Sequence, residues 1–405
     1  MTPIKVAFFT TFLDLLGFGI IIPIQPFYAE SFGASPTIVT LLGASYSLMQ
    51  FLCSSSMGKL SDRIGRRPVL LGSVLLIIVG YLAFAQATTL TGLFVARMIS
   101  GIGGANLGAA QAVIADVTTP ENRSKGMGVI GAAFGLGFIF GPALGGWLGQ
   151  WGPLYPIYLA AALAALNWLF IYFCLPETLK IATNESEQNK KALSLKELAT
   201  YQNLPQLLGL AFSFTMAFAL MEQTVGLFIE QVWLHDVIDN QSRHSQAASQ
   251  TAYFLVAVGV GASIIQGGLI GKFTKRWGEV RLCQTGVLIV ATTFAMIPIA
   301  GQSYPSWSMM LIGFLMAVGT GVLHPSRSSL LSQSVPMEHQ GRALGASQSL
   351  SALGRVFGPA SAGLLFEYDI NLPFWVGAII IGSALILTRK LSSVRSPEPL
   401  ASSAV

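Results

Sequence analysis

Charge is scarce in this sequence. Only 10% of its 405 residues are Asp, Glu, Lys or Arg, and 53% are hydrophobic. Soluble domains carry about 25% charged residues. A chain with so little charge cannot cover a water-facing surface. This composition excludes an ordinary soluble enzyme, a disordered chain and a basic nucleic-acid binder.

Cysteine and histidine are also rare. Three cysteines cannot make a disulfide framework, and four widely spaced histidines form no metal-ligand cluster. We therefore expect no metal and no cofactor. Glycine and proline, by contrast, are plentiful, with 43 and 19 residues. Such numbers suit close-packed, kinked membrane helices.

Long apolar runs dominate what remains. A membrane span needs about 20 mostly apolar residues. The sequence predicts twelve spans, at 5–25, 37–57, 68–87, 92–114, 126–148, 154–175, 205–229, 250–271, 281–300, 306–329, 342–365 and 372–390. The first run contains Asp14 and lacks a small-residue cleavage site, so we read it as a retained helix and not as a signal peptide.

The basic residues give the orientation. Of the 23 Lys and Arg residues, 19 fall on one side of the predicted spans and only Arg243 falls on the other. By the positive-inside rule this predicts that both termini are cytoplasmic. The net charge of +5 is then a matter of topology, and we expect no nucleic-acid partner.

A polar stretch divides the chain into two halves. We predict a six-helix bundle over 1–178, a cytoplasmic linker over 179–204, a second six-helix bundle over 205–391, and a cytoplasmic tail over 392–405. The fold class expected is an all-α membrane protein of two pseudo-symmetric bundles.

The two halves repeat short motifs. The segment Gly58–Pro68 has a degenerate copy at Gly271–Glu279, and Leu136–Gly146 resembles Leu353–Gly363 at nearly the same offset. Two repeats in the same order argue for a duplicated six-helix unit. Repeated halves with a site between them near the midplane are typical of transporters.

These motifs carry a resemblance to a known family. Gly58–Pro68 resembles the loop signature of the major facilitator superfamily, and Arg97 with Gly101 resembles its span-4 motif. Phe12–Pro23 and Leu175–Thr178 (L-P-E-T) are similar to its drug:proton antiporter branch, which includes tetracycline exporters. The resemblance implies a multi-pass transporter of a small molecule in the lipid bilayer of a bacterial inner membrane. We expect a monomer, because each pair of halves already encloses one pathway.

A conformational latch is expected at the loop between spans 2 and 3. Its glycines allow a tight turn, and an acid at a helix end can accept hydrogen bonds from a neighbouring arginine. In the family this loop acts as a latch between the halves in the outward-open state. The latch residues are Gly58, Asp62, Arg63, Gly65, Arg66, Arg67, Asp116 and Arg123.

Span 5 carries the motif that resembles the antiporter signature. Its small residues let neighbouring backbones approach closely, and a proline bends the helix. The resemblance implies that this helix shapes the seam between the halves and limits proton leak. The residues are Gly135, Gly141, Pro142, Gly145 and Gly146.

Three charged residues within the spans give the strongest indication of a functional site. An acid at mid-bilayer costs roughly 2.5–3.5 kcal/mol on insertion scales, so it normally faces a cavity or a partner. Asp14 in span 1 and Glu222 in span 7 occupy equivalent helices of the two halves. We expect both to carry protons, with Arg97 in span 4 as a partner for Asp14 or a switch of its proton affinity. A structural ion pair is the alternative for each.

Polar side chains in or near the spans are the candidates for contact with cargo. Amide side chains in or near the spans can hydrogen-bond a substrate, and they include Gln25, Gln50, Asn106, Gln111, Asn167, Gln223, Gln266 and Gln348. Arg355 either neutralises Glu222 or binds an anionic group. His324 and Arg327 flank Pro325 and are further cavity candidates.

The sequence predicts a proton-coupled antiporter that exports small amphipathic compounds by alternating access. One alternative is an exporter or importer of one metabolite or siderophore, for which Arg355, Arg327 and His324 would favour an anionic cargo. A non-transporting membrane sensor is a remote alternative. An enzyme is not expected, because no nucleophile–base set lies in the spans. Tetracycline exporters carry an acid in span 9, and residues 282–303 contain none.

Overall fold

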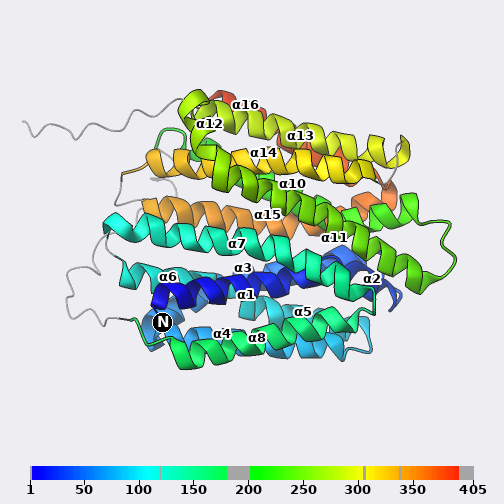
Figure 1. Ribbon diagram of the computed structural model, residues 1–405, viewed down its shortest axis with the longest axis horizontal. Helices are drawn as coiled ribbons and strands as arrows, with labels where there is room; N and C mark the ends of the chain where they lie inside the picture. The colour runs from blue at the N-terminus through cyan, green and yellow to red at the C-terminus, as the bar shows by residue number, and fades with distance from the viewer. Residues whose placement is uncertain (1, 119, 180–200, 304–306, 337–339, 392–405) are drawn as a thin grey trace, which may run out of the picture.

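The computed structural model describes residues 2–118, 120–179, 201–303, 307–336 and 340–391. In these ranges it is helical, and the long helices run side by side (Figure 1). The predicted linker at 179–204 falls mostly, and the predicted tail at 392–405 entirely, outside the described residues.

The first half forms one group of helices. It contains α1 (Pro3–Ile21), α2 (Gln25–Glu30), α3 (Pro36–Ile64), α4 (Arg66–Ala85), α5 (Leu90–Gly103), the 3-10 turn η1 (Gly104–Asn106), α6 (Leu107–Val117), α7 (Pro120–Gly149) and α8 (Leu154–Cys174). In Figure 1 these blue to green helices fill the lower part of the molecule.

The second half lies above the first in the same view. It contains α10 (Leu204–Trp233), α11 (Asn240–Ile264), the π-helical turn η2 (Ile265–Leu269), α12 (Ile270–Trp277), α13 (Glu279–Ser303), α14 (Trp307–Gln333), α15 (Gln340–Tyr368) and α16 (Leu372–Arg389). All twelve predicted spans fall on helices of these two groups, and most ends lie within a few residues of the prediction.

Ten helices among the described residues are long and apolar enough to cross a membrane. The remaining two predicted spans correspond to α7 and α15. In α7 the apolar stretch Gly135–Gly149 is shorter than the ten spanning helices. Exposed aromatic side chains gather where helices end, as is typical at a membrane interface. They include Trp151, Tyr155, Trp307 and Tyr368.

Local sequence signals set several helix starts. Proline occupies the first turn of α1, α2, α3, α10 and α16, where its missing N–H costs nothing. Thr89 caps α5 by accepting a hydrogen bond from the Gly92 N–H over 3.1 Å. Asp239 caps α11 in the same way, from the Ser242 N–H over 2.8 Å.

The halves pack through α3 against α15 and through α7 against α11. We call the end of the bundle that carries Arg63 and Arg66 the inner end, and the opposite end, which carries α2, the outer end. At the outer end a Cβ on Gly363 of α15 would overlap Thr37 of α3, and one on Gly146 of α7 would overlap Ala252 of α11.

The inner ends of the same helices are less crowded. A Cβ added to Gly58 of α3 or to Gly345 of α15 would meet no atom within 4 Å among the described residues. The two halves therefore touch closely at the outer end, and their inner ends leave open space.

Candidate functional site

A cavity of about 100 Å³ lies at the centre of the bundle. Eight of its fifteen lining residues are apolar, aromatic or glycine and seven carry polar or charged side chains, so apolar walls and polar groups meet there, as is typical of small-molecule sites. Most of the lining comes from the first half, and Arg355 reaches it from α15 of the second. The lining residues are Thr11, Asp14, Leu15, Phe18, Tyr46, Ser47, Gln50, Ile77, Tyr81, Ser100, Gly104, Asn106, Leu107, Phe138 and Arg355.

Asp14 is held in this cavity by two amide side chains. Asn106 Nδ2 donates to one carboxylate oxygen over 2.6 Å, and Asn167 Nδ2 donates to the other over 2.9 Å. Asn106 belongs to η1, the 3-10 interruption between α5 and α6, which turns its side chain toward α1. Short 3-10 stretches inside longer helices often mark functional positions. The arrangement keeps an acid inside the bundle without an ion pair among the described residues.

Arg97 is not the described partner of Asp14. Its guanidinium carbon lies 4.7 Å from the centroid of the Tyr46 ring and 6.0 Å from that of Phe18. Its Nε and Nη1 atoms are buried and have no hydrogen-bond partner among the described residues. In this conformation the arginine is stabilised by aromatic faces. The expected pair of Asp14 and Arg97 is therefore not formed here.

Glu222 is the counterpart of Asp14 in the second half. It lies on α10, and its Oε1 atom is buried without a hydrogen-bond partner among the described residues. Arg355 lies within electrostatic reach of Glu222 and of Tyr46, so it connects the second acid to the cavity that contains the first. Next to it, Gln223 packs against α3, where a Cβ on Gly43 would overlap its amide.

The other cargo candidates separate into two groups. Gln50 lines the cavity and donates from Nε2 to the Gly104 carbonyl over 2.8 Å. Gln25 is buried in α2 and does not line the cavity. His324 and Arg327 do not line it either, since the His324 ring packs at 4.7 Å from that of Phe214 and Arg327 faces Cys283.

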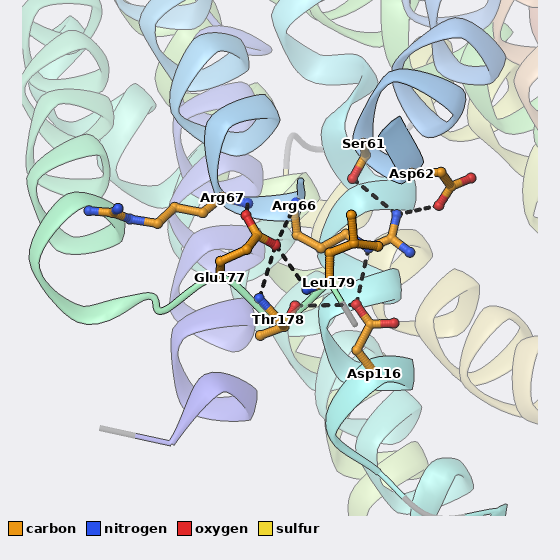
Figure 2. Close-up of polar contacts among 8 residues, drawn as sticks. All are labelled: Ser61, Asp62, Arg66, Arg67, Asp116, Glu177, Thr178 and Leu179. Carbon is orange, nitrogen blue, oxygen red and sulfur yellow. Dashed lines mark hydrogen bonds and ion pairs between the residues drawn. The ribbon is translucent and has the colours of Figure 1, made fainter. Parts of the chain in front are cut away.

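The inner-end charges form a connected cluster, drawn in Figure 2. Arg66 pairs with Asp62 through Nη1 and with Asp116 through Nε, the latter over 3.1 Å. Thr178 also donates to Asp116, over 3.2 Å. These residues come from α3, α4, the end of α6 and the chain after α8, so the cluster ties together four segments of the first half.

Glu177 is the part of this cluster that sequence reasoning missed. Its carboxylate accepts hydrogen bonds from the backbone N–H groups of Arg66 and Arg67 over 2.9 and 3.2 Å, and thereby caps α4 (Figure 2). The N–H groups of Thr178 and Leu179 point at the same carboxylate. The burial of Glu177 alone would raise the pKa of its carboxyl, but these four donors outweigh burial and lower the pKa.

The remaining latch residues take different positions. Gly65 has a φ of +110°, which a residue with a side chain rarely adopts, and a Cβ there would overlap the Glu177 carboxylate. Arg67 turns away to α8, where it donates to the Tyr172 carbonyl over 2.6 Å. Arg63 is exposed. The side chain of Arg123 lies outside the described residues.

The glycines of α7 mark two contact faces. A Cβ on Gly141 or Gly145 would overlap the backbone of α1 at Gly19 or Ile20, and Pro142 also lies close to Gly19. Gly146 faces Ala252 of α11 in the other half, and Gly135 has looser space near Ser263. The motif thus places α7 against α1 on one side and against the second half on the other.

A wider hollow of about 350 Å³ opens at the outer junction of α7 and α11. Gln150, Ser245, Gln246, Ser249, Gln250 and Tyr253 line it. This lining contains no acid and no basic residue. The buried charges accordingly favour the central cavity as the functional site.

Comparison with known proteins agrees with this geometry. The family model described as Major Facilitator Superfamily matches residues 7–308 and 241–405. The chain is 32% identical to the tetracycline resistance protein, class B, of Escherichia coli over 97% of this chain and 96% of that protein. It is 29% identical to multidrug resistance protein 1 of Bacillus subtilis over 93% of each.

Two solved structures are also similar. The human organic anion transporter MFSD10 superposes with a TM-score of 0.68 at 25% identity, over 95% of this chain and 98% of that one. A nucleoside transporter superposes with a TM-score of 0.73 at 14% identity, over 96% of this chain and 98% of that one, and at that identity shows the fold alone.

Proposed function

The chain belongs to the major facilitator superfamily, and from that premise we propose that it exports small amphipathic compounds in exchange for protons. Members of this family are transporters rather than enzymes, and the bacterial relatives are named as tetracycline and multidrug resistance proteins. The observation that carries the proposal is the pair of intramembrane acids, Asp14 and Glu222, in equivalent helices of the two halves.

The setting of Asp14 supports a proton-binding role. Its carboxylate lines the cavity, and its described partners are the neutral amides of Asn106 and Asn167. An acid without a fixed cation can gain and lose a proton as its surroundings change between two conformations. In this account the proton is the coupling ion and no other cofactor takes part.

The shape of the bundle supports alternating access. The outer ends of α3 and α15 touch, whereas their inner ends have room. Rocking of one half against the other around a fixed central site would expose that site to the opposite side. The inner-end cluster around Arg66 would then act as the latch in the outward-open state. This proposal includes twelve spans, cytoplasmic termini and a monomer.

The walls of the cavity support an amphipathic cargo. Phe18, Tyr46, Tyr81 and Phe138 supply aromatic surface, and Ser47 and Gln50 supply hydrogen-bonding groups. Aromatic faces can pack against flat or apolar compounds without requiring one particular molecular shape. The names of the tetracycline and multidrug resistance relatives point to the same class of compound.

A second candidate is a transporter of one anionic compound. Arg355 lines the cavity, and Arg97 has two buried nitrogens without described hydrogen-bond partners. Buried guanidinium groups of this kind can recognise a carboxylate. The similar human structure is named as an organic anion transporter.

The experiment uses purified protein in liposomes that hold a pH-sensitive dye. A proton gradient is imposed, and cationic, neutral and anionic compounds are added one at a time. Proton movement that depends on a cationic or neutral amphipathic compound is the expected result. Movement only with anions would favour the second candidate. Compound movement without any proton movement would contradict antiport.

A further inference from the structure

The outer end holds a second cluster of charges that the central site does not use. It forms where α2, from the first half, packs into the second half. Phe27 of α2 is only 4% exposed, and its ring lies 5.6 Å from that of His244 on α11. Phe27 also shares an apolar cluster with Leu234, Ala247 and Ala248. Phe27 of this short helix therefore packs into an apolar cluster of the second half.

Four charged or titratable side chains meet beside Phe27. His244 Nε2 lies 3.4 Å from Glu230 Oε1, which belongs to α10, and 3.7 Å from Glu30 Oε2 at the end of α2. Arg243 Nε lies 2.8 Å from the same Glu230 oxygen. These four residues are the charged and titratable groups that face one another here from the described parts of α2, α10 and α11.

Two of these groups are neighbouring acids. A carboxylate oxygen of Glu30 and one of Glu230 lie within 4.8 Å of each other. An ionised carboxylate only accepts hydrogen bonds, so a bond between two carboxyl groups requires a proton on one of them. Glu30 is the more favourable site for this proton, because Glu230 already faces Arg243 and His244.

The surroundings of Glu30 agree with that assignment. Burial raises the pKa of its carboxyl, and the nearby Glu230 carboxylate raises it further, while Arg243 opposes them. The side chains of Glu30 and His244 keep 21% and 23% of their surface exposed, so protons from water at the outer end can reach them.

We propose that Glu30, Glu230 and His244 form an outer lock, which closes when a proton from the outer side binds between the two carboxylates. Without that proton, two like charges lie within 4.8 Å of each other across the boundary between the halves. Their repulsion weakens the hold of α2 on α10 and α11. Outer protons therefore favour the outer-closed, inward-open form. This inference goes beyond the proposed exchange reaction and requires no cargo or proton transport.

The sign of the pH effect follows from linkage. The closed form binds the Glu30 proton more tightly than an open form in which the carboxyl is hydrated. Closure is therefore favoured at low pH and is lost as pH rises through the raised pKa of Glu30. One proton released on opening changes the ratio of open to closed molecules by up to about tenfold per pH unit in that window.

A distance measurement tests the lock directly. Spin labels are placed at Tyr155 and Ile238, exposed outer-end positions in the two halves, after replacement of Cys53, Cys174 and Cys283. The protein is held in nanodiscs with EDTA and no cargo, and distances are recorded from pH 5 to pH 9. In the wild-type protein, the fraction of molecules with a longer distance between the two labels should increase as pH rises.

Two variants and a matched control identify the groups. Glu30→Gln mimics the protonated acid, so the distances should stay short at all pH values. Glu230→Gln removes the facing anion and should also flatten the pH dependence. Glu367→Gln is the control, because Glu367 also bridges the halves at the outer end, by accepting from the Thr37 N–H over 3.0 Å, without a described acid beside it. That variant should keep the wild-type response.

Three results would overturn the lock. One is a wild-type distance distribution that does not change between pH 5 and pH 9. Another is an unchanged pH response in both Glu30→Gln and Glu230→Gln. The third is a pH response that appears only when EDTA is omitted, because His244 and the two acids would then be holding a metal ion. Since the readout is a distance without transport, failure of the lock would leave the proton-exchange proposal untouched.

Discussion

Asn167 on α8 donates a hydrogen bond to the Asp14 carboxylate on α1 over 2.9 Å, and Asn106 donates to its other oxygen over 2.6 Å. Asn167 is fully buried and is not among the residues that line the cavity. It therefore acts on the acid and not on cargo. In this conformation two neutral amides fill the place that the sequence suggested for Arg97.

Asn167→Ala should change the pH at which exchange operates. The lost donor stabilises the ionised acid, and a hydrogen bond to a charged group is worth about 1.5–3 kcal/mol. The pH profile of proton-driven transport should therefore differ from that of wild type, because the acid has lost one of its two described donors. Transport rates measured in liposomes from pH 5 to pH 9 give the profile.

Gln284→Ala is the matched control for this experiment. Gln284 donates to the Thr388 carbonyl over 3.1 Å, in the second half and away from both acids. Its loss should lower stability without moving the pH profile. Equal profile shifts in both variants would show that Asn167 acts only through folding.

Glu177→Gln should destabilise the inner end in a pH-dependent way. The carboxylate caps α4, and loss of a helix cap costs about 0.5–2 kcal/mol. The backbone donors lower the pKa of Glu177, so its contribution is present above the usual carboxyl range and is lost as pH falls through the lowered pKa. The variant should melt below wild type at pH 7 and at the same temperature as wild type at the acid limit. A deficit that persists in acid would contradict this role.

Gly65→Ala should be much worse tolerated than Gly58→Ala. Gly65 needs its φ of +110°, and a Cβ would overlap the Glu177 carboxylate. We expect a loss of about 1–3 kcal/mol, the usual cost of a strained backbone. Gly58 lies inside α3, where no atom of the described residues comes within 4 Å of an added Cβ, and alanine there should be neutral or slightly stabilising. Thermal unfolding in detergent compares the two.

Gly146→Ala should disturb the outer seam, whereas Gly135→Ala should not. A Cβ at Gly146 would overlap Ala252 of the opposite half, and one at Gly135 would lie 3.6 Å from Ser263. The first variant should slow transport several-fold by hindering outer closure, with the second near wild type. Equal rates in the two variants would mean that this contact does not limit the cycle.

The helices and some of the site could be predicted from sequence because their signals are local. A long apolar run predicts a membrane span. Asp14 stands out because inserting an acid within such a run into the bilayer costs free energy. Arg66 and Asp116 were expected in one cluster because both flank inner loops, and the structure brings them together. The function of that cluster as a latch stays a prediction.

The missed features depend on contacts between distant segments. Asn167 sits in a predicted span, but an amide there gives no sign of which neighbour it meets. Glu30 is far along the chain from Glu230 and His244, and each looks like an ordinary polar residue near a helix end. Only the packing of α2 into the second half brings them together. Glu177 was visible in the L-P-E-T segment, but its capping role depends on where α8 ends.

Cargo-dependent proton movement in Asp14→Asn liposomes tests the central claim most directly. Asparagine keeps the size of the side chain but cannot exchange a proton. Ser47→Ala serves as the control, because Ser47 lines the same cavity without a charge. We predict that Asp14→Asn folds and loses proton movement, that Glu222→Gln impairs either coupling or cargo binding, and that Ser47→Ala retains both. Wild-type proton movement with cargo in the Asp14→Asn protein would contradict the account.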